Sequence, residues 1–178
     1  MDPVIDTALR TGLSVLFLAA AVHKLRDLGR FRATLAEYRL LSPRLVAPGA
    51  IALVVTELAL AVALVAPCVR TAGSVAAAVL LSIYGGAMAV NLARGRRHID
   101  CGCAGPAARR PISALLVARN AVLAAAALGG LVPVSTRPLS WVDGVTVLGA
   151  TGTLAALYSA FDRLLMLAPA RAMLRGGT

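Results

Sequence analysis

Charged and aromatic residues are both scarce in this chain. Asp, Glu, Lys and Arg make up 15% of its 178 residues, and Phe, Trp and Tyr make up only 4%. Soluble domains carry about 25% charged residues, so this composition excludes a soluble globular domain. Hydrophobic residues instead reach 59%, and the mean hydropathy is +0.82. These values indicate an integral membrane protein.

The sequence also lacks a Ser/Gly-rich linker, an acidic tail and an internal repeat. We therefore expect one transmembrane domain over residues 1–178. Its apolar residues fall into five blocks, each near the roughly 20 residues that a helix needs to cross a membrane. The blocks cover about 8–23, 46–66, 72–93, 112–132 and 142–167. They predict an all-α, polytopic bundle of four core helices with a fifth helix added.

The first and last blocks contain charges that bear on this prediction. Asp2, Asp6 and Arg10 stand where a signal peptide would have a positive n-region, so we expect the first helix to be retained. Asp162 and Arg163 interrupt the last block. This leaves open an arrangement in which residues 142–161 span the membrane and residues 164–174 lie along its surface.

The 18 basic residues are distributed unevenly along the chain. Most of them fall in the first and third connections between the blocks: Lys24, Arg26, Arg30, Arg32, Arg39 and Arg44, then Arg94, Arg96, Arg97, Arg109 and Arg110. Short cytoplasmic loops retain Lys and Arg, so we predict the N-terminus outside and the C-terminus and third connection inside. The net charge of +10 then reflects topology and anionic lipids rather than nucleic acid. Arg-rich, Lys-poor usage favours a bacterial plasma membrane.

Residues 25–41 repeat apolar side chains at three- and four-residue steps, with arginines between them. This pattern predicts an amphipathic helix at the membrane interface. Such a helix would serve as a surface anchor or as a docking platform beside the third connection.

The third connection, residues 94–111, contains the motif Cys101-Gly102-Cys103. A disulfide between these thiols would close a small, strained ring that opens readily, which suits thiol exchange. The reduced pair could instead bind a soft metal together with His98. The third interpretation is two small apolar side chains packed in a tight turn.

Neighbouring residues add to the chemistry of this motif. Nearby arginines and His98 would stabilise a thiolate, whereas Asp100 would orient His98 or oppose that effect. Gly102 and Gly105 permit tight backbone turns. The segment is small and mostly apolar from residue 99 to 108, so it could also re-enter the membrane within the protein.

Glu57 and Arg119 lie well inside the second and fourth predicted spans, where each needs a partner or a polar cavity. Glu57 and Arg119 lie at heights that differ by about 6 Å at 1.5 Å per helical residue. We predict an ion pair between them, with direct proton transfer by Glu57 as the alternative. Asn91, Asn120 and Tyr84 add polar groups on neighbouring helices, and such a lining could bind a quinone headgroup.

Cys68 lies at the opposite end of the second predicted span, on the outer side in this topology. A lone thiol at a helix end is typical of a small packed side chain. The alternative is an outer thiol that helps to move reducing equivalents across the membrane.

Several short pieces occur together, in order, between about residue 20 and residue 125. They are His23-Lys24-Leu25-Arg26-Asp27 with Phe31 and Tyr38, Glu57, Asn91 and Arg94, Asp100-Cys101-Gly102-Cys103-Ala104-Gly105, and Arg119-Asn120. This set resembles the MauE/DoxX-like family of redox-associated membrane proteins, in its methylamine-utilisation MauE branch. Ala104 departs from the pattern, because the family often has an aromatic residue there.

The resemblance implies a function in the formation or maintenance of disulfides in exported proteins, alongside a thioredoxin-like partner. Cys101 and Cys103 would be the exchanging thiols. Among the supporting residues, the resemblance adds His23 and Lys24 to those already named. Such clients need chemistry outside the cell, whereas the charge pattern places the loop inside. A re-entrant loop, or a relay from a cytoplasmic donor, would reconcile the two.

Our leading hypothesis is therefore a membrane thiol–disulfide oxidoreductase component. The alternatives are a noncatalytic subunit or assembly factor of a larger complex, and a metal-binding protein that uses His98, Cys101 and Cys103. A quinone is the candidate cofactor, and a metal is the second candidate.

Overall fold

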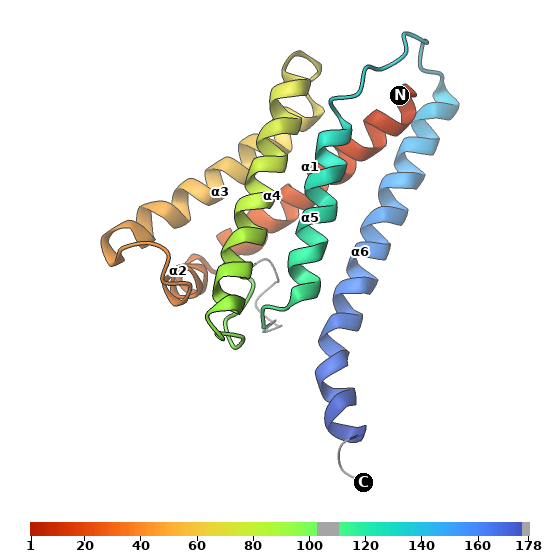
Figure 1. Cartoon of the computed structure of the whole chain (residues 1–178). Helices are drawn as coiled ribbons and strands as arrows, with labels where there is room; N and C mark the ends of the chain where they lie inside the picture. The colour runs from red at the N-terminus through yellow and green to blue at the C-terminus, as the bar shows by residue number, and fades with distance from the viewer. Residues whose placement is uncertain (103–110, 176–178) are drawn as a thin grey trace.

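The computed structural model describes residues 1–102 and 111–175, and for residues 162 and 165–175 it describes the backbone alone. Within these ranges the regular secondary structure is helical, apart from one isolated bridge between Asp100 and Pro111. The prediction of an all-α bundle is confirmed (Figure 1). The elements are α1 (Pro3–Arg26), α2 (Leu28–Glu37), α3 (Pro43–Val65), the short 3-10 helix η1 (Pro67–Val69), α4 (Arg70–Ala93), α5 (Ala114–Gly129) and α6 (Trp141–Arg175).

Four stretches are long and apolar enough to cross a membrane: α1, α3, η1 with α4, and α6 as far as Phe161. Helix α5 is also apolar, but its 16 residues reach only about 24 Å, less than the roughly 30 Å of a hydrocarbon core. Branched apolar side chains such as Val62, Val79, Ile83 and Val122 are exposed on the outside of the bundle. The chain is therefore a multi-pass membrane protein with lipid-facing apolar surfaces.

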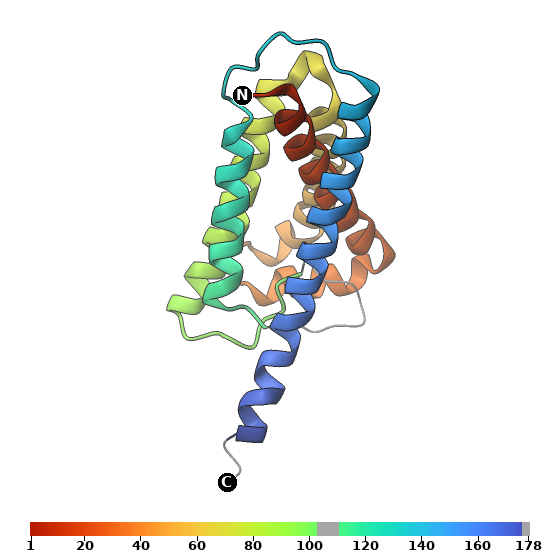
Figure 2. The ribbon, with the colours of Figure 1, turned by 90° about the vertical axis from the view of Figure 1, so that its right-hand side faces the viewer.

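Helices α1, α3, α4 and α5 form the packed part of the bundle, and α6 lies against α1 (Figures 1 and 2). The chain passes back and forth between two ends. We call the end with α2 and residues 94–102 and 111–113 the loop end. The other, with residues 1–3, 66–70 and 130–140, is the N-terminal end. Helix α6 starts at the N-terminal end and extends past the other helices at the loop end (Figure 2).

Asp27 separates α1 from α2. Its carboxylate accepts a hydrogen bond from the backbone N–H of Arg30 at 2.9 Å, which caps the start of α2. Helix α1 therefore extends to Arg26. The amphipathic helix that we expected over residues 25–41 is shorter and covers Leu28–Glu37. At the other end of α1, the side chain of Asp2 caps the helix, which begins at Pro3 rather than near residue 8.

Helix α6 continues through Asp162 and Arg163 to Arg175, as one helix of 35 residues. The backbone therefore does not break where the sequence left open a separate surface helix from residue 164. Asp and Arg raise the cost of placing a segment in lipid but are compatible with helical backbone geometry.

Small residues set the closest helix contacts. A Cβ on Gly85 of α4 would lie 3.4 Å from the Cβ of Asn120 on α5, and one on Gly73 would lie 3.2 Å from the backbone oxygen of Ala63. Such close approach is typical of membrane helix pairs, which gain stability from packing. Phe17 and Leu64 fill the core between α1, α3 and α4.

Candidate functional site

A buried ion pair connects α1 and α3. Lys24 of α1 donates from Nζ to Oε1 of Glu57 on α3, and the two side chains are 3% and 0% exposed. Tyr84 of α4 donates its hydroxyl to the same oxygen at 2.8 Å. Three helices therefore converge on one carboxylate.

Two aromatic rings enclose the ammonium group. Lys24 Nζ lies 5.1 Å from the ring centre of Phe31 on α2 and 5.0 Å from that of Tyr84. Rings at this distance attract a cation through their negative faces, more strongly where water is excluded. We call Lys24, Glu57, Tyr84 and Phe31 the lysine cluster.

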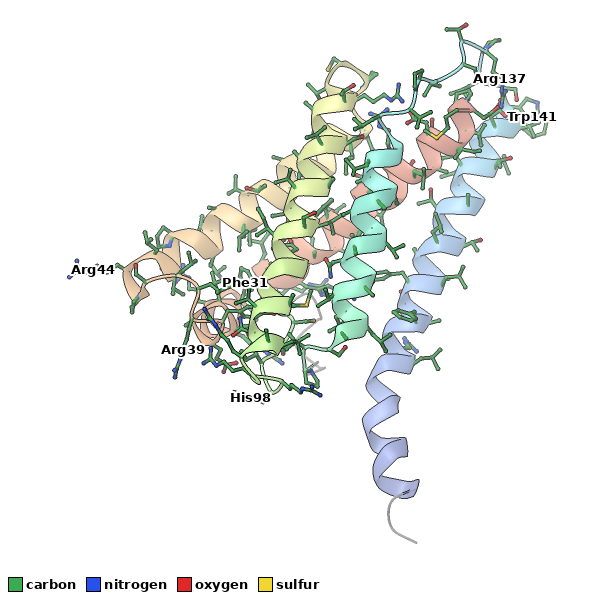
Figure 3. All side chains as sticks on the ribbon, in the orientation of Figure 1. Phe31, Arg39, Arg44, His98, Arg137 and Trp141 are labelled. Carbon is green, nitrogen blue, oxygen red and sulfur yellow. The ribbon has the colours of Figure 1, made fainter. Side chains whose placement is uncertain are left out.

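A narrow cleft lies between two residues of the lysine cluster, Lys24 and Phe31, and residues 94–102 of the third connection, which we call the thiol loop. The cleft has a free volume of about 20 Å³, which is room for a water molecule. Its lining comes from the end of α1, from α2 and from the thiol loop: His23, Lys24, Asp27, Arg30, Phe31, Thr34, Asp100 and Gly102. Figure 3 shows Phe31 at the loop end of the bundle, with Arg39 and His98 in the same region.

The thiol loop packs against helix α2. Arg30 forms a salt bridge with Asp100 at 3.2 Å between Nη2 and Oδ2. Gly102 has a φ of +72°, a conformation that favours glycine, and its position faces Thr34 and Phe31. On the far side, the N–H of Ile112 donates to the oxygen of Ile99 at 2.9 Å, so residues before and after the motif are paired.

Cys101 is 9% exposed and packs in an apolar group at the ends of α4 and α5. Its neighbours in that group include Met88, Ile99 and Ile112. Asp100 and Gly102, which flank it in sequence, both line the cleft. The partner thiol predicted from the motif, Cys103, and the turn residue Gly105 lie outside the described residues.

The predicted ion pair between Glu57 and Arg119 is wrong. Glu57 pairs with Lys24, whereas the guanidinium of Arg119 lies 5.3 Å from the ring centre of Tyr158 on α6. Height along a helix fixes how deep a residue lies but not which neighbour it faces, and Lys24, in the last turn of α1, faces Glu57 of α3. Arg119 thus connects α5 to α6.

The predicted polar residues Asn91 and Asn120 are buried but bond locally. Asn120 donates to the oxygen of Leu116 at 2.9 Å, and Asn91 donates to that of Ala87 at 3.1 Å. Asn91 also accepts a hydrogen bond from Arg96 at 3.2 Å, which holds the start of the third connection. Both residues therefore stabilise the helices around the site and do not line the cleft.

The two histidines have different environments. His98 is exposed at the loop end, whereas Cys101 is buried. His23 lines the cleft, and its Nδ1 is buried without a hydrogen-bond partner among residues 1–102 and 111–175. Within the same ranges no three His, Cys, Asp or Glu side chains come close enough to hold a metal ion.

The N-terminal end carries a second charged network. Arg10 and Arg70 both pair with the buried Asp6, at 3.6 and 3.3 Å. Arg70 also donates to the oxygens of Gly130 and Val132, so α1, α4 and the α5–α6 connection are joined. Cys68 lies in η1 at this end, exposed and in the thiol form.

Sequence reasoning missed the lysine cluster as a unit. Lys24 was predicted as a site residue only through the family resemblance, and Arg30 was named only as one of many basic residues. One signal was available: Lys24 is the only lysine among the 18 basic residues. A chain that uses arginine at every other basic position has a lysine at the one position where, among the side chains that the structure describes, a basic residue is buried.

Comparison with known proteins gives a consistent result. The sequence profile described as methylamine utilisation protein MauE matches residues 2–133. Methylamine utilisation protein MauE of Paracoccus denitrificans is 40% identical over 161 residues, which cover 89% of this chain and 86% of that protein. Those of Methylophilus methylotrophus and Paracoccus versutus are 36% and 41% identical, over 90% and 88% of this chain and 86% and 85% of their own lengths. No solved structure matches the chain.

Proposed function

Because the chain belongs to the family of the methylamine utilisation protein MauE, we propose that it is the membrane component of a thiol–disulfide exchange system. The exchanging pair is Cys101 and Cys103. The system forms or maintains disulfides in exported proteins, works with a thioredoxin-like partner, and serves methylamine utilisation as the names of the relatives indicate. The family resemblance drawn from the motifs is confirmed by the profile and the relatives.

The position of the residues beside Cys101 carries this proposal. Asp100 and Gly102 share the cleft with Lys24 and Arg30, two cations from different helices. Cationic side chains near a cysteine stabilise the thiolate, which is the species that attacks a disulfide. Lys24 and Arg30 line the same cleft as the residues on either side of Cys101, which supports the proposal.

In the proposed reaction, a thiolate of a client attacks the Cys101–Cys103 disulfide and forms a mixed disulfide with one of the two sulfurs. The second client thiol then displaces that sulfur. The client gains a disulfide, and Cys101 and Cys103 gain two electrons and two protons as thiols. A disulfide of the thioredoxin-like partner, or a quinone, takes those electrons and resets the pair. When the partner's disulfide is the acceptor, it becomes the dithiol.

The pair's redox activity can be tested on the full-length protein in detergent micelles. The reduced protein is treated with hydroxyethyl disulfide, a mild oxidant, and the remaining thiols are counted with a maleimide. We expect Cys68→Ser to lose two thiols without gaining the mass of an attached hydroxyethylthio group, in agreement with formation of one internal disulfide. Cys101→Ser and Cys103→Ser, each with one thiol of the pair left, serve as matched controls and should form no internal disulfide. A wild-type pair that never oxidises would leave the noncatalytic subunit as the better hypothesis.

A further inference from the structure

The first half of the thiol loop, residues 94–98, is a turn fixed to the end of α4. The N–H of Gly95 donates to the oxygen of Leu92 at 3.0 Å, and the N–H of Arg96 donates to that of Asn91 at 3.0 Å. With a φ of +74° at Gly95, these bonds form a Schellman motif, a common way for a helix to end on glycine. The side chain of Arg96 also donates to the buried side chain of Asn91. The turn is therefore anchored to the helix by backbone and side chain.

Two arginines of this turn are exposed to the surroundings of the bundle. Arg94 and Arg97 are both exposed, and neither forms a salt bridge within residues 1–102 and 111–175. His98 beside them is exposed as well. Asp100, the acidic residue of the same loop, already pairs with Arg30 of α2. Within the described residues the turn thus carries two unpaired positive charges.

The turn is suited to contact with water rather than with lipid. Residues 94–98 contain no large apolar side chain. A Cβ on Gly95 would have no described atom within 4 Å outside its chain neighbours, so the turn projects from the bundle. By contrast, the exposed arginines near the end of α1 and the start of α3 each adjoin a leucine that is more than half exposed: Arg26 with Leu25, and Arg44 with Leu45. Such pairs suit the membrane interface, where the leucine enters lipid and the arginine reaches the headgroups.

The turn is also close enough to Cys101 for its charges to act there. Cys101 follows Arg97 by four residues, and a chain spans at most about 3.6 Å per residue, so their Cα atoms lie within about 14 Å of each other. Charges act over about 30 Å at 0.01 M salt and about 8 Å at 0.15 M. A molecule whose disulfide approaches Cys101 therefore enters the field of the two arginines. That field attracts an acidic surface and repels a basic one.

We propose that residues 94–98 are a docking turn for a protein with an acidic surface beside its disulfide, an inference that rests on the proposed function. Arg94 and Arg97 pair with carboxylates of that surface and bring its disulfide to the thiol loop. Cys101 is only 9% exposed, so recognition depends on the side chains around it. The turn is already ordered by its hydrogen bonds, which lowers the entropic cost of docking. Its charges select the partner and speed the encounter, because they act before the sulfurs meet.

Two peptide disulfides test the docking turn. Each is a dimer of one short peptide joined through its cysteine, with aspartate on both sides of the cysteine in one dimer and lysine in the other. The reduced, full-length Cys68→Ser protein in zwitterionic detergent is mixed with either dimer, and the loss of thiols is followed with a maleimide. Each rate is divided by that of mercaptoethanol with the same dimer, which removes the peptide's own reactivity. At about 0.01 M salt we expect the acidic dimer to react on the order of ten times faster, and at about 0.15 M the preference should shrink.

Matched double variants in the same Cys68→Ser protein assign the preference to the turn. Arg94→Gln with Arg97→Gln should reduce it to about two-fold or less. The same thiolate attacks both dimers, so a change in the amount of thiolate does not alter the ratio of their rates. The control is Arg26→Gln with Arg44→Gln, which removes the same charge beside the exposed leucines and should keep the preference. Figure 3 shows Arg44 well away from His98 of the turn.

Three other results would count against the docking turn. Equal loss of the preference in the two double variants would indicate an effect of net charge and overturn it. So would a difference between wild type and the turn variant that persists in phosphatidylcholine bilayers but disappears in phosphatidylglycerol bilayers, because the arginines would then bind lipid headgroups. Thiols that react with both dimers without preference would overturn the docking turn alone. Thiols that react with neither dimer nor with hydroxyethyl disulfide would instead refute the proposed thiol function, and the docking turn with it.

Discussion

The lysine cluster is the feature in which single residues matter most. Taking two charges out of water is costly, and their mutual attraction offsets that cost only when hydrogen bonds complete the site. Here Tyr84 adds a hydrogen bond to Glu57, and the rings of Phe31 and Tyr84 face the ammonium of Lys24. Removing either charge leaves the other buried without compensation.

We expect Glu57→Gln to lower the free energy of unfolding by about 3–5 kcal/mol, because it leaves the ammonium of Lys24 buried without a counter-charge. The double variant Lys24→Met with Glu57→Gln should recover part of this loss. Denaturant unfolding in detergent micelles measures both. Arg119→Gln is the comparison: its effect should add to that of Glu57→Gln, since these residues are not partners. Strong coupling between Glu57 and Arg119 would contradict the assignment.

Gly102 gives a second prediction at the scale of a residue. Gly102 and Gly95 have φ values of +72° and +74°, so alanine at either strains the backbone by about 1–2 kcal/mol. A Cβ on Gly102 would approach Thr34 and Phe31 of α2, whereas a Cβ on Gly95 would have no described atom within 4 Å outside its chain neighbours. Because about 1 kcal/mol changes a population roughly five-fold, Gly102→Ala should speed maleimide labelling of Cys101 by about that factor. Gly95→Ala, the matched control, should leave the labelling rate unchanged. Equal acceleration in the two variants would argue against packing of Gly102 on α2.

At the scale of elements, capping residues explain where the helices begin and end. Asp27 ends α1 and starts α2, and Asp2 starts α1. Asp2 also has a role between elements: Arg137 of the α5–α6 connection donates to its carboxylate at 3.0 Å. Arg137 pairs with Asp143 at the start of α6 as well, so one side chain connects the starts of α1 and α6 (Figure 3).

This contact predicts a pH dependence at the N-terminal end. The hydrogen bond from Arg137, helped by that from the N–H of Val4, lowers the pKa of Asp2 below its usual value. A lowered pKa in the folded state means that the stabilisation is complete above the usual value of about 3.9 and is lost as the pH falls through the folded pKa. A carboxyl titration followed by NMR should show this midpoint below about 3.9 in the wild type. Arg137→Gln should raise it, and an unchanged midpoint would contradict the contact.

Apolar blocks predicted the elements because a membrane span needs a continuous run of apolar residues, and that run is visible in the sequence. The ends of α1 and α2 were less predictable, since the boundary between the two helices depends on the cap at Asp27. The partner of Glu57 was not predictable from depth alone. Arg119 lies at a suitable height, but helix rotation and packing decide that Lys24 faces α3.

At the scale of the whole molecule, the two ends of the bundle differ in charge and in thiols. The loop end carries the arginines of α2 and of residues 94–97, together with Cys101. The N-terminal end carries Cys68 and the network around Asp6. The helices place Cys68 and Cys101 at opposite ends of the bundle. Thiol exchange between them within one chain would therefore need an intermediate carrier.

This separation makes the orientation in the membrane measurable with two single-cysteine variants. One retains Cys68 and the other retains Cys101, with the remaining cysteines changed to serine. Because basic residues are retained on the cytoplasmic side, a membrane-impermeant maleimide added to intact cells should label Cys68 and leave Cys101 unlabelled. A permeant maleimide should label Cys101 after the cells are lysed and the protein is unfolded, which shows that this thiol is free to react, while the labelling of Cys68 reports the sidedness. Labelling of Cys101 by the impermeant reagent in intact cells would reverse the topology. It would also place the thiol loop on the side where exported clients fold, so that no relay across the membrane would be required.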